Sequence, residues 1–164
     1  MIICYIELIK LRILSLSLVT MTLGYILGRT GESFNFSLYL VSLIGVMLSS
    51  SAAASFNQLI EQKYDALMPR TKNRPLPSGR ISSMHVFLFS SILLLLGSFI
   101  LFKYVNFLTC LLCLFTVFIY DLIYTPLKRI TPFNTFIGAI PGAMPVLCGW
   151  SSAMGYIPET AWIF

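Results

Sequence analysis

Five apolar runs, each long enough to cross a lipid bilayer, dominate this sequence: residues 11–28, 36–58, 84–102, 105–124 and 134–153. A helix needs roughly 20 such residues to span the hydrocarbon core. Backbone polar groups in lipid must be satisfied internally, and the runs lack the alternation of a membrane barrel, so each should be a helix. With only 10% charged residues, the sequence predicts an all-α, polytopic transmembrane helix bundle.

Basic residues indicate how these spans are oriented, because short cytoplasmic loops are enriched in Lys and Arg. With the N-terminus inside, nine of the eleven basic residues lie on the cytoplasmic side, and Arg29 and Lys103 lie outside. The nine are Lys10, Arg12, Lys63, Arg70, Lys72, Arg74, Arg80, Lys128 and Arg129. We therefore expect a cytoplasmic N-terminus, and basic loops that meet anionic headgroups or a phosphorylated ligand rather than nucleic acid.

The segment from Asn57 to Arg80 gathers seven of the seventeen charged residues at the end of the second span. Asn57, Glu61 and Asp65 are spaced at i, i+4 and i+8, so on a continuing helix they form one row. Two carboxylates and an amide oxygen are suitable ligands for Mg²⁺, which is commonly coordinated by protein carboxylates together with substrate phosphates. On spacing alone, a solvated helix end paired with Lys63 and its neighbours explains the row equally well.

Basic residues follow this acidic row closely. Arg70, Lys72 and Arg74 come within nine residues of Asp65, on a segment that its prolines keep out of regular helix. Lys128 and Arg129 follow the fourth span and can reach the same anion. Arg binds phosphate oxygens bidentately. An acidic row followed by basic residues therefore favours a site for a diphosphate that is bridged to the protein by a metal ion. The positive-inside rule alone explains the side of the membrane on which these cations lie.

Small residues and cysteines within the spans favour packing roles. The run SSSAAAS, residues 49–55, and the G-x-x-x-G pair Gly138 and Gly142 predict close helix contacts, with a kink at Pro141 and Pro145. Cys110 and Cys113 form a C-x-x-C pattern inside an apolar helix, where small hydrophobic packing is favoured over a metal or redox site.

The motif NxxxExxxDxxMxRTxxRPL, residues 57–76, resembles the first acidic motif of the intramembrane prenyltransferase superfamily that includes para-hydroxybenzoate polyprenyltransferase. More narrowly, RTKNRPLPSGRIS, residues 70–82, and YTPLKRITPFNTFIGAIPGAMP, residues 124–145, look like the protoheme IX farnesyltransferases, or haem O synthases. The resemblance covers nearly the whole chain from the second span onward. Glu61 stands where many relatives have Asp, which preserves a carboxylate.

The resemblance implies Mg²⁺-dependent transfer of farnesyl from farnesyl diphosphate to a vinyl group of haem B, giving haem O for terminal oxidases. Asn57, Glu61 and Asp65 would be the catalytic metal cluster, and Arg70, Arg74 and Lys128 would contact diphosphate. It further implies a bacterial plasma membrane location. Haem A synthase and terminal oxidase assembly factors are the protein partners that it suggests.

The family pattern also has nine helices, a second acidic motif and a histidine-containing segment for haem, of which this sequence shows only about five helices. We therefore expect residues 1–164 to form the N-terminal part of a single membrane-embedded prenyltransferase domain that is inactive without its second half. The other functions considered are prenyl transfer to an aromatic quinone precursor, an inactive truncated fragment, a non-catalytic membrane subunit and half of a transporter. A transporter would place polar residues at mid-membrane rather than at one mouth.

Overall fold

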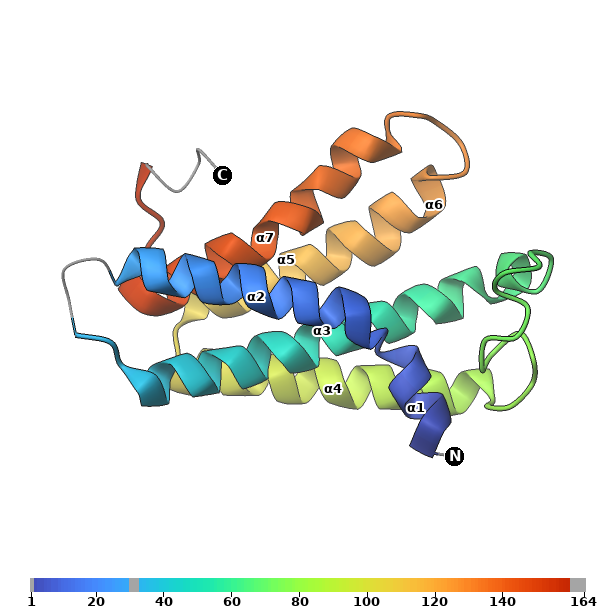
Figure 1. Cartoon of the computed structure of the whole chain (residues 1–164), viewed down its shortest axis with the longest axis horizontal. Coiled ribbons are helices and arrows are strands. Elements are labelled where there is room, and N and C mark those ends of the chain that lie inside the picture. Colours follow the sequence, from blue (N-terminus) through green and yellow to red (C-terminus); the bar gives the residue numbers. More distant parts are fainter. Residues whose placement is uncertain (1, 30–32, 160–164) are drawn as a thin grey trace.

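The computed structural model describes residues 2–29 and 33–159, and its regular elements in those ranges are all helical. They are α1 (Ile2–Leu8), α2 (Leu11–Gly28), α3 (Phe36–Asp65), α4 (Ser83–Tyr104), α5 (Phe107–Phe118), the π-helix η1 (Ile119–Tyr124), α6 (Thr125–Leu127) and α7 (Asn134–Met154). Figure 1 shows the long helices running roughly side by side, with the loop between α3 and α4 at one end of the bundle.

The predicted all-α membrane bundle is confirmed. Five segments are long and apolar enough to cross a bilayer: α2, α3, α4, the continuous run Phe107–Leu127, and α7. The second span continues to Asp65, seven residues beyond its predicted end, so the acidic row lies on regular helix as its spacing required. Neither the short helix α1 nor the π-helical turn was predicted from the sequence.

Helix pairs at the centre of the bundle approach through glycines. An added Cβ on Gly149 of α7 would lie 2.0 Å from the Met21 carbonyl oxygen, and one on Gly24 of α2 would lie 2.1 Å from the Val146 carbonyl oxygen. The backbones of α2 and α7 therefore touch at this level. Towards the loop joining α6 to α7 the two helices diverge (Figure 1).

The predicted packing role of small residues holds for the run at 49–55, in which every residue except Ser50 is buried. On α4, Gly97 lies against Ser49 closely enough that an added Cβ would be 2.7 Å from its Oγ. The G-x-x-x-G prediction was wrong at Gly142, where a Cβ would meet nothing within 4 Å. Gly142 lines a cavity instead.

Replacement of Gly149 by Ala should destabilise the bundle by about 1–3 kcal/mol, since the methyl group overlaps backbone that cannot rotate away. Gly142→Ala is the matched control on the same helix. It should be neutral or stabilising by up to about 1 kcal/mol, because Ala favours helix and the site is open. Unfolding of the purified variants by SDS titration measures both, and equal stability of the two would contradict the α2–α7 contact.

The chain before α2 is fastened to the loop after α3. The Glu7 carboxylate accepts two hydrogen bonds from Arg80, at 3.0 and 2.6 Å. Gln58 of α3 donates to the carbonyl oxygens of Glu7 and Leu8, and Leu8 packs with Leu76, Ile81 and Val86. The chain then turns through Lys10, whose φ of 50° is left-handed. This turn brings the Lys10 side chain to the end of α3.

Candidate functional site

The predicted acidic row lies on a buried face of α3. Asn57, Glu61 and Asp65 are only 1%, 8% and 5% exposed, although they occupy the last turns of the helix. A solvated helix end is therefore the wrong description of this row. Buried carboxylates need compensating partners, because removing charge from water is costly.

Those partners come from three separate parts of the chain. Lys10 donates to Asn57 Oδ1 at 2.6 Å, and Arg74 Nη1 lies 2.6 Å from Asp65 Oδ2. Glu61 Oε1 contacts both Lys128 Nζ, at 2.5 Å, and Arg129 Nη2, at 3.1 Å. Each member of the acidic row is thus held by a cation from outside its own helix. The result is a compact, alternating cluster of oxygen and nitrogen groups at one mouth of the bundle.

The structure brings together five of the six predicted site residues and leaves Arg70 apart. Arg70 is exposed and, within residues 2–29 and 33–159, makes no ion pair with the row. Two cations of the cluster, Lys10 and Arg129, were not among the six predicted site residues, although Arg129 was expected to be able to reach the same anion. Arg129 also stacks its guanidinium 3.3 Å from the ring centroid of Tyr64. Its signal was the adjacency to Lys128, whereas nothing local marked Lys10.

Burial changes the ionisation of Lys10. The desolvation that accompanies burial, with the charge of Arg74 next in size, lowers the pKa of the Lys10 ammonium from 10.5 to about 8. The amine thus remains mainly protonated at neutral pH. Its hydrogen-bond partner Asn57 is uncharged, so Lys10 is the cation of the cluster that is bound directly to no carboxylate.

The π-helical turn η1 supplies the wall opposite α3. Thr125, which follows it, donates to the Tyr120 carbonyl and accepts a 2.8 Å hydrogen bond from Asn57 Nδ2. Tyr120 and Tyr124 stack with ring centroids 5.6 Å apart. The Asp121 carboxylate is buried, and neither oxygen has a hydrogen-bond partner in the part of the chain that the structure describes. π-bulges of this kind are frequent at functional sites.

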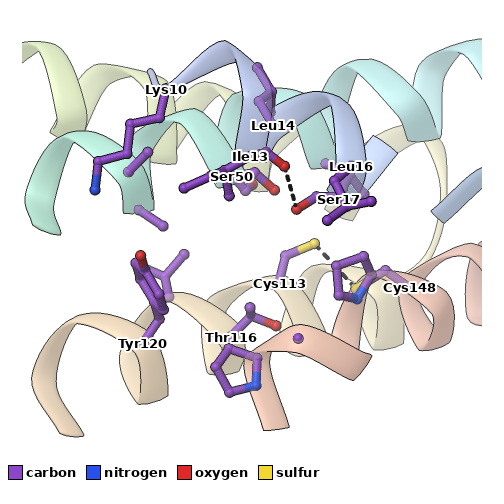
Figure 2. Close-up of a pocket in the computed structure, with 18 of the residues that line it drawn as sticks. Lys10, Ile13, Leu14, Leu16, Ser17, Ser50, Cys113, Thr116, Tyr120 and Cys148 are labelled. Carbon is purple, nitrogen blue, oxygen red and sulfur yellow. Dashed lines mark hydrogen bonds between the residues drawn. The ribbon is translucent and has the colours of Figure 1, made fainter. Parts of the chain in front are cut away.

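An apolar cavity of about 350 Å³ opens beside the charged cluster, between α2, α3, α5, η1 and α7. Figure 2 shows Lys10 and Tyr120 at one end and Cys113 and Cys148 towards the other. The two sulfurs are 3.6 Å apart. The expected packing roles of Cys110 and Cys113 are confirmed, because both are buried in one core cluster with Cys148. The arrangement places a polar, cationic mouth on an apolar chamber.

The donor set of the acidic row is compatible with Mg²⁺ that is shared with a substrate. In the described ranges no three His, Cys, Asp or Glu side chains converge as a complete metal site. Glu61 and Asp65 offer two buried carboxylates, with the amide oxygen of Asn57 beside them. Mg²⁺ commonly takes one or two carboxylates and completes its shell with water and phosphate oxygens. A hard cation would therefore fit here together with an anionic ligand.

The fold is similar to that of solved structures of a UbiA homologue. A UbiA homologue from Archaeoglobus fulgidus, bound to DMAPP and Mg²⁺, matches 97% of this chain and 57% of its own, with a TM-score of 0.81 and 17% identity. The same homologue bound to GPP and Mg²⁺ gives a TM-score of 0.80 over 98% of this chain, at 18% identity. At these identities the likeness concerns the fold.

Sequence relatives are closer. The protoheme IX farnesyltransferase of Shewanella sediminis is 41% identical over 92% of this chain and 50% of its own length. That of Flavobacterium johnsoniae is 40% identical over 80% and 44%, and the mitochondrial protein of Arabidopsis thaliana is 38% identical over 98% and 37%. The chain thus spans about half the length of the curated relatives it matches. Residues 17–164 match the UbiA prenyltransferase family, and the chain belongs to that family.

Proposed function

We propose that this chain forms the diphosphate-binding half of a farnesyltransferase that converts haem B to haem O. The observation that carries the proposal is the set of buried carboxylates, each held by a basic side chain, at the mouth of an apolar cavity. The substrates follow from the relatives named above, since farnesyl diphosphate and protohaem are the pair that their name implies. Mg²⁺ is the proposed cofactor, as in the A. fulgidus homologue.

The ion pairs suggest how the site would receive its substrate. Arg74, Lys128 and Arg129 already stand beside the oxygens of Asp65 and Glu61. When a diphosphate enters with its cation, these basic groups would turn to phosphate oxygens, because charge-assisted bonds to phosphate are strong and often bidentate for Arg. The freed carboxylates would bind Mg²⁺. Bound there, Mg²⁺ would neutralise the charge that accumulates on the departing diphosphate.

The cavity would hold the farnesyl chain and shape the reaction at its first carbon. Tyr120 lies at the same end of the cavity as Lys10 (Figure 2), and Tyr124, which also lines the cavity, has its ring centroid 5.8 Å from Lys128 Nζ. Both rings would therefore lie near the carbon at which allylic positive charge develops. Aromatic faces stabilise such charge by cation–π contact. The apolar walls would exclude bulk water until the farnesyl carbon has joined the vinyl group of haem B, after which one water supplies the new hydroxyl.

Direct binding tests this proposal on the chain itself. Purified protein should bind farnesyl diphosphate in the presence of Mg²⁺ and much more weakly in EDTA, as measured by equilibrium binding of isotope-labelled ligand. Lys10→Met should weaken binding by about tenfold or more, the usual effect of losing one buried charge-assisted contact. Arg12→Met is the control, because Arg12 is exposed two residues away. Equal binding of farnesyl diphosphate with Mg²⁺ and with EDTA, and by wild type and Lys10→Met, would contradict the proposed site.

The proposed location is a bacterial plasma membrane, with the N-terminus and the charged cluster facing the cytoplasm. Lys72 and Lys103 are exposed near opposite ends of α4, one in the preceding loop and one in its last turn. With the native cysteines replaced, a cysteine introduced for Lys103 should react with an impermeant maleimide in intact cells. A cysteine introduced for Lys72 should react only after permeabilisation. The reverse labelling pattern would contradict the proposed orientation and place the N-terminus outside the cytoplasm.

A further inference from the structure

The cavity beside the charged cluster has a definite length. On α7 it is lined by Gly138, Pro141, Gly142, Pro145 and Cys148, a face that repeats every three or four residues. Gly138 packs against Tyr124 at the mouth, and Cys148 lies ten residues further along the helix. At 1.5 Å rise per residue the cavity therefore extends about 15 Å along α7.

The inner end of this cavity is closed by packing. Cys113 and Cys148 are 5% and 1% exposed and touch through their sulfurs at 3.6 Å. Met21, Val46 and Leu101 form a buried cluster with the two cysteines, and of these three only Val46 also lines the cavity. One residue beyond Cys148, Gly149 brings the backbone of α7 against that of α2. The two backbones leave no space for even a methyl group at this level.

We propose that the thiol pair Cys113–Cys148 is the floor of the prenyl cavity and limits the isoprenoid chain that the site accepts to about fifteen carbons. This inference rests on the proposed function, since it concerns the donor of that reaction. A farnesyl chain has about eleven backbone carbon–carbon bonds of about 1.5 Å each and extends to about 14 Å. With the diphosphate at Lys10, its last isoprene unit reaches the two sulfurs.

The fit distinguishes donors by length. A ten-carbon geranyl chain from the same mouth would end near Gly142 and Thr116, leaving the floor without contact. A twenty-carbon chain would have to displace Met21 or separate α2 from α7 at Gly149, where backbone atoms already touch. Interiors packed to this density resist added volume. Farnesyl is therefore the longest chain that can extend along α7 from the mouth to the floor.

Photo-crosslinking of the whole chain in lipid nanodiscs tests the floor. The probes are farnesyl and geranyl diphosphates that carry a diazirine on the terminal isoprene unit, added with Mg²⁺. The farnesyl probe should label peptides at Cys113 and Cys148, and the geranyl probe peptides nearer Pro141. Identical labelling by both probes, or labelling of the exposed residue Leu111, would contradict the proposal that the thiol pair forms the floor. Absence of any Mg²⁺-dependent binding would instead overturn the proposed function itself.

A substitution at the floor provides a second measurement. Cys148→Phe fills the inner end, so the ratio of farnesyl to geranyl diphosphate affinity should fall about tenfold or more, because at least two buried CH₂ groups lose their place. Leu111→Phe adds the same ring to the outer face of α5, where Leu111 is exposed and outside the cavity, and should leave the ratio unchanged. An unchanged ratio in Cys148→Phe would overturn the proposal. If that variant fails to fold, the wild-type crosslinks decide.

Discussion

Replacement of Asp65 by Asn should lower haem O formation by about 100-fold or more, the size expected when a charged group that stabilises a leaving group is removed. The substitution keeps the shape of the side chain and replaces one carboxylate oxygen with an amide nitrogen. Arg74, now 2.6 Å from Asp65, would lose its anionic partner, and the metal would lose a ligand. Haem extracted from cells in which the chain works with the C-terminal half of the S. sediminis relative provides the measurement.

Two further substitutions separate charge from general damage. Glu61→Asp keeps a carboxylate near Lys128 and Arg129, so its effect should be milder than that of Glu61→Gln. Glu7→Gln removes an acid of the same mouth that pairs with Arg80 in an exposed position, and exposed pairs contribute little. Near-normal haem O from Asp65→Asn would remove Asp65 from the metal site.

The sequence predicted the features that depend on local pattern. Hydropathy located all five spans, because lipid imposes length and composition on each helix independently of its neighbours. The spacing of Asn57, Glu61 and Asp65 correctly placed them on one helical face. The contact between Arg74 and Asp65 was made possible by their separation of nine residues, but that length of chain can also span about 30 Å, so the contact itself depends on how the loop folds.

Features that depend on how distant segments meet could not be predicted in this way. Lys10 reaches Asn57 only because the chain turns through a left-handed residue and α1 is fastened to Arg80 and Gln58. The π-helical turn arises within an ordinary apolar run and has no distinct periodicity at that length. The prediction of close packing at Gly142 was wrong for the same reason. A small-residue spacing indicates that a helix can approach closely but does not indicate which helix does so.

Residues 1–164 alone should make no haem O, which is the largest effect that we predict. The family resemblance implies a second acidic motif, which lies in the C-terminal half of each family member. Five helices also leave the cavity side at Gly142 open, where small faces in membrane proteins usually meet a neighbouring helix.

The most direct test of this account is the haem content of cells that lack their own haem O synthase. They would express the chain alone, the chain with the separately encoded C-terminal half of the S. sediminis relative, or that relative's own two halves as a control for splitting. The account predicts haem O in the second and third cases and none in the first. Haem O from the lone chain, or its absence from the second case while the control succeeds, would contradict a site built from two halves.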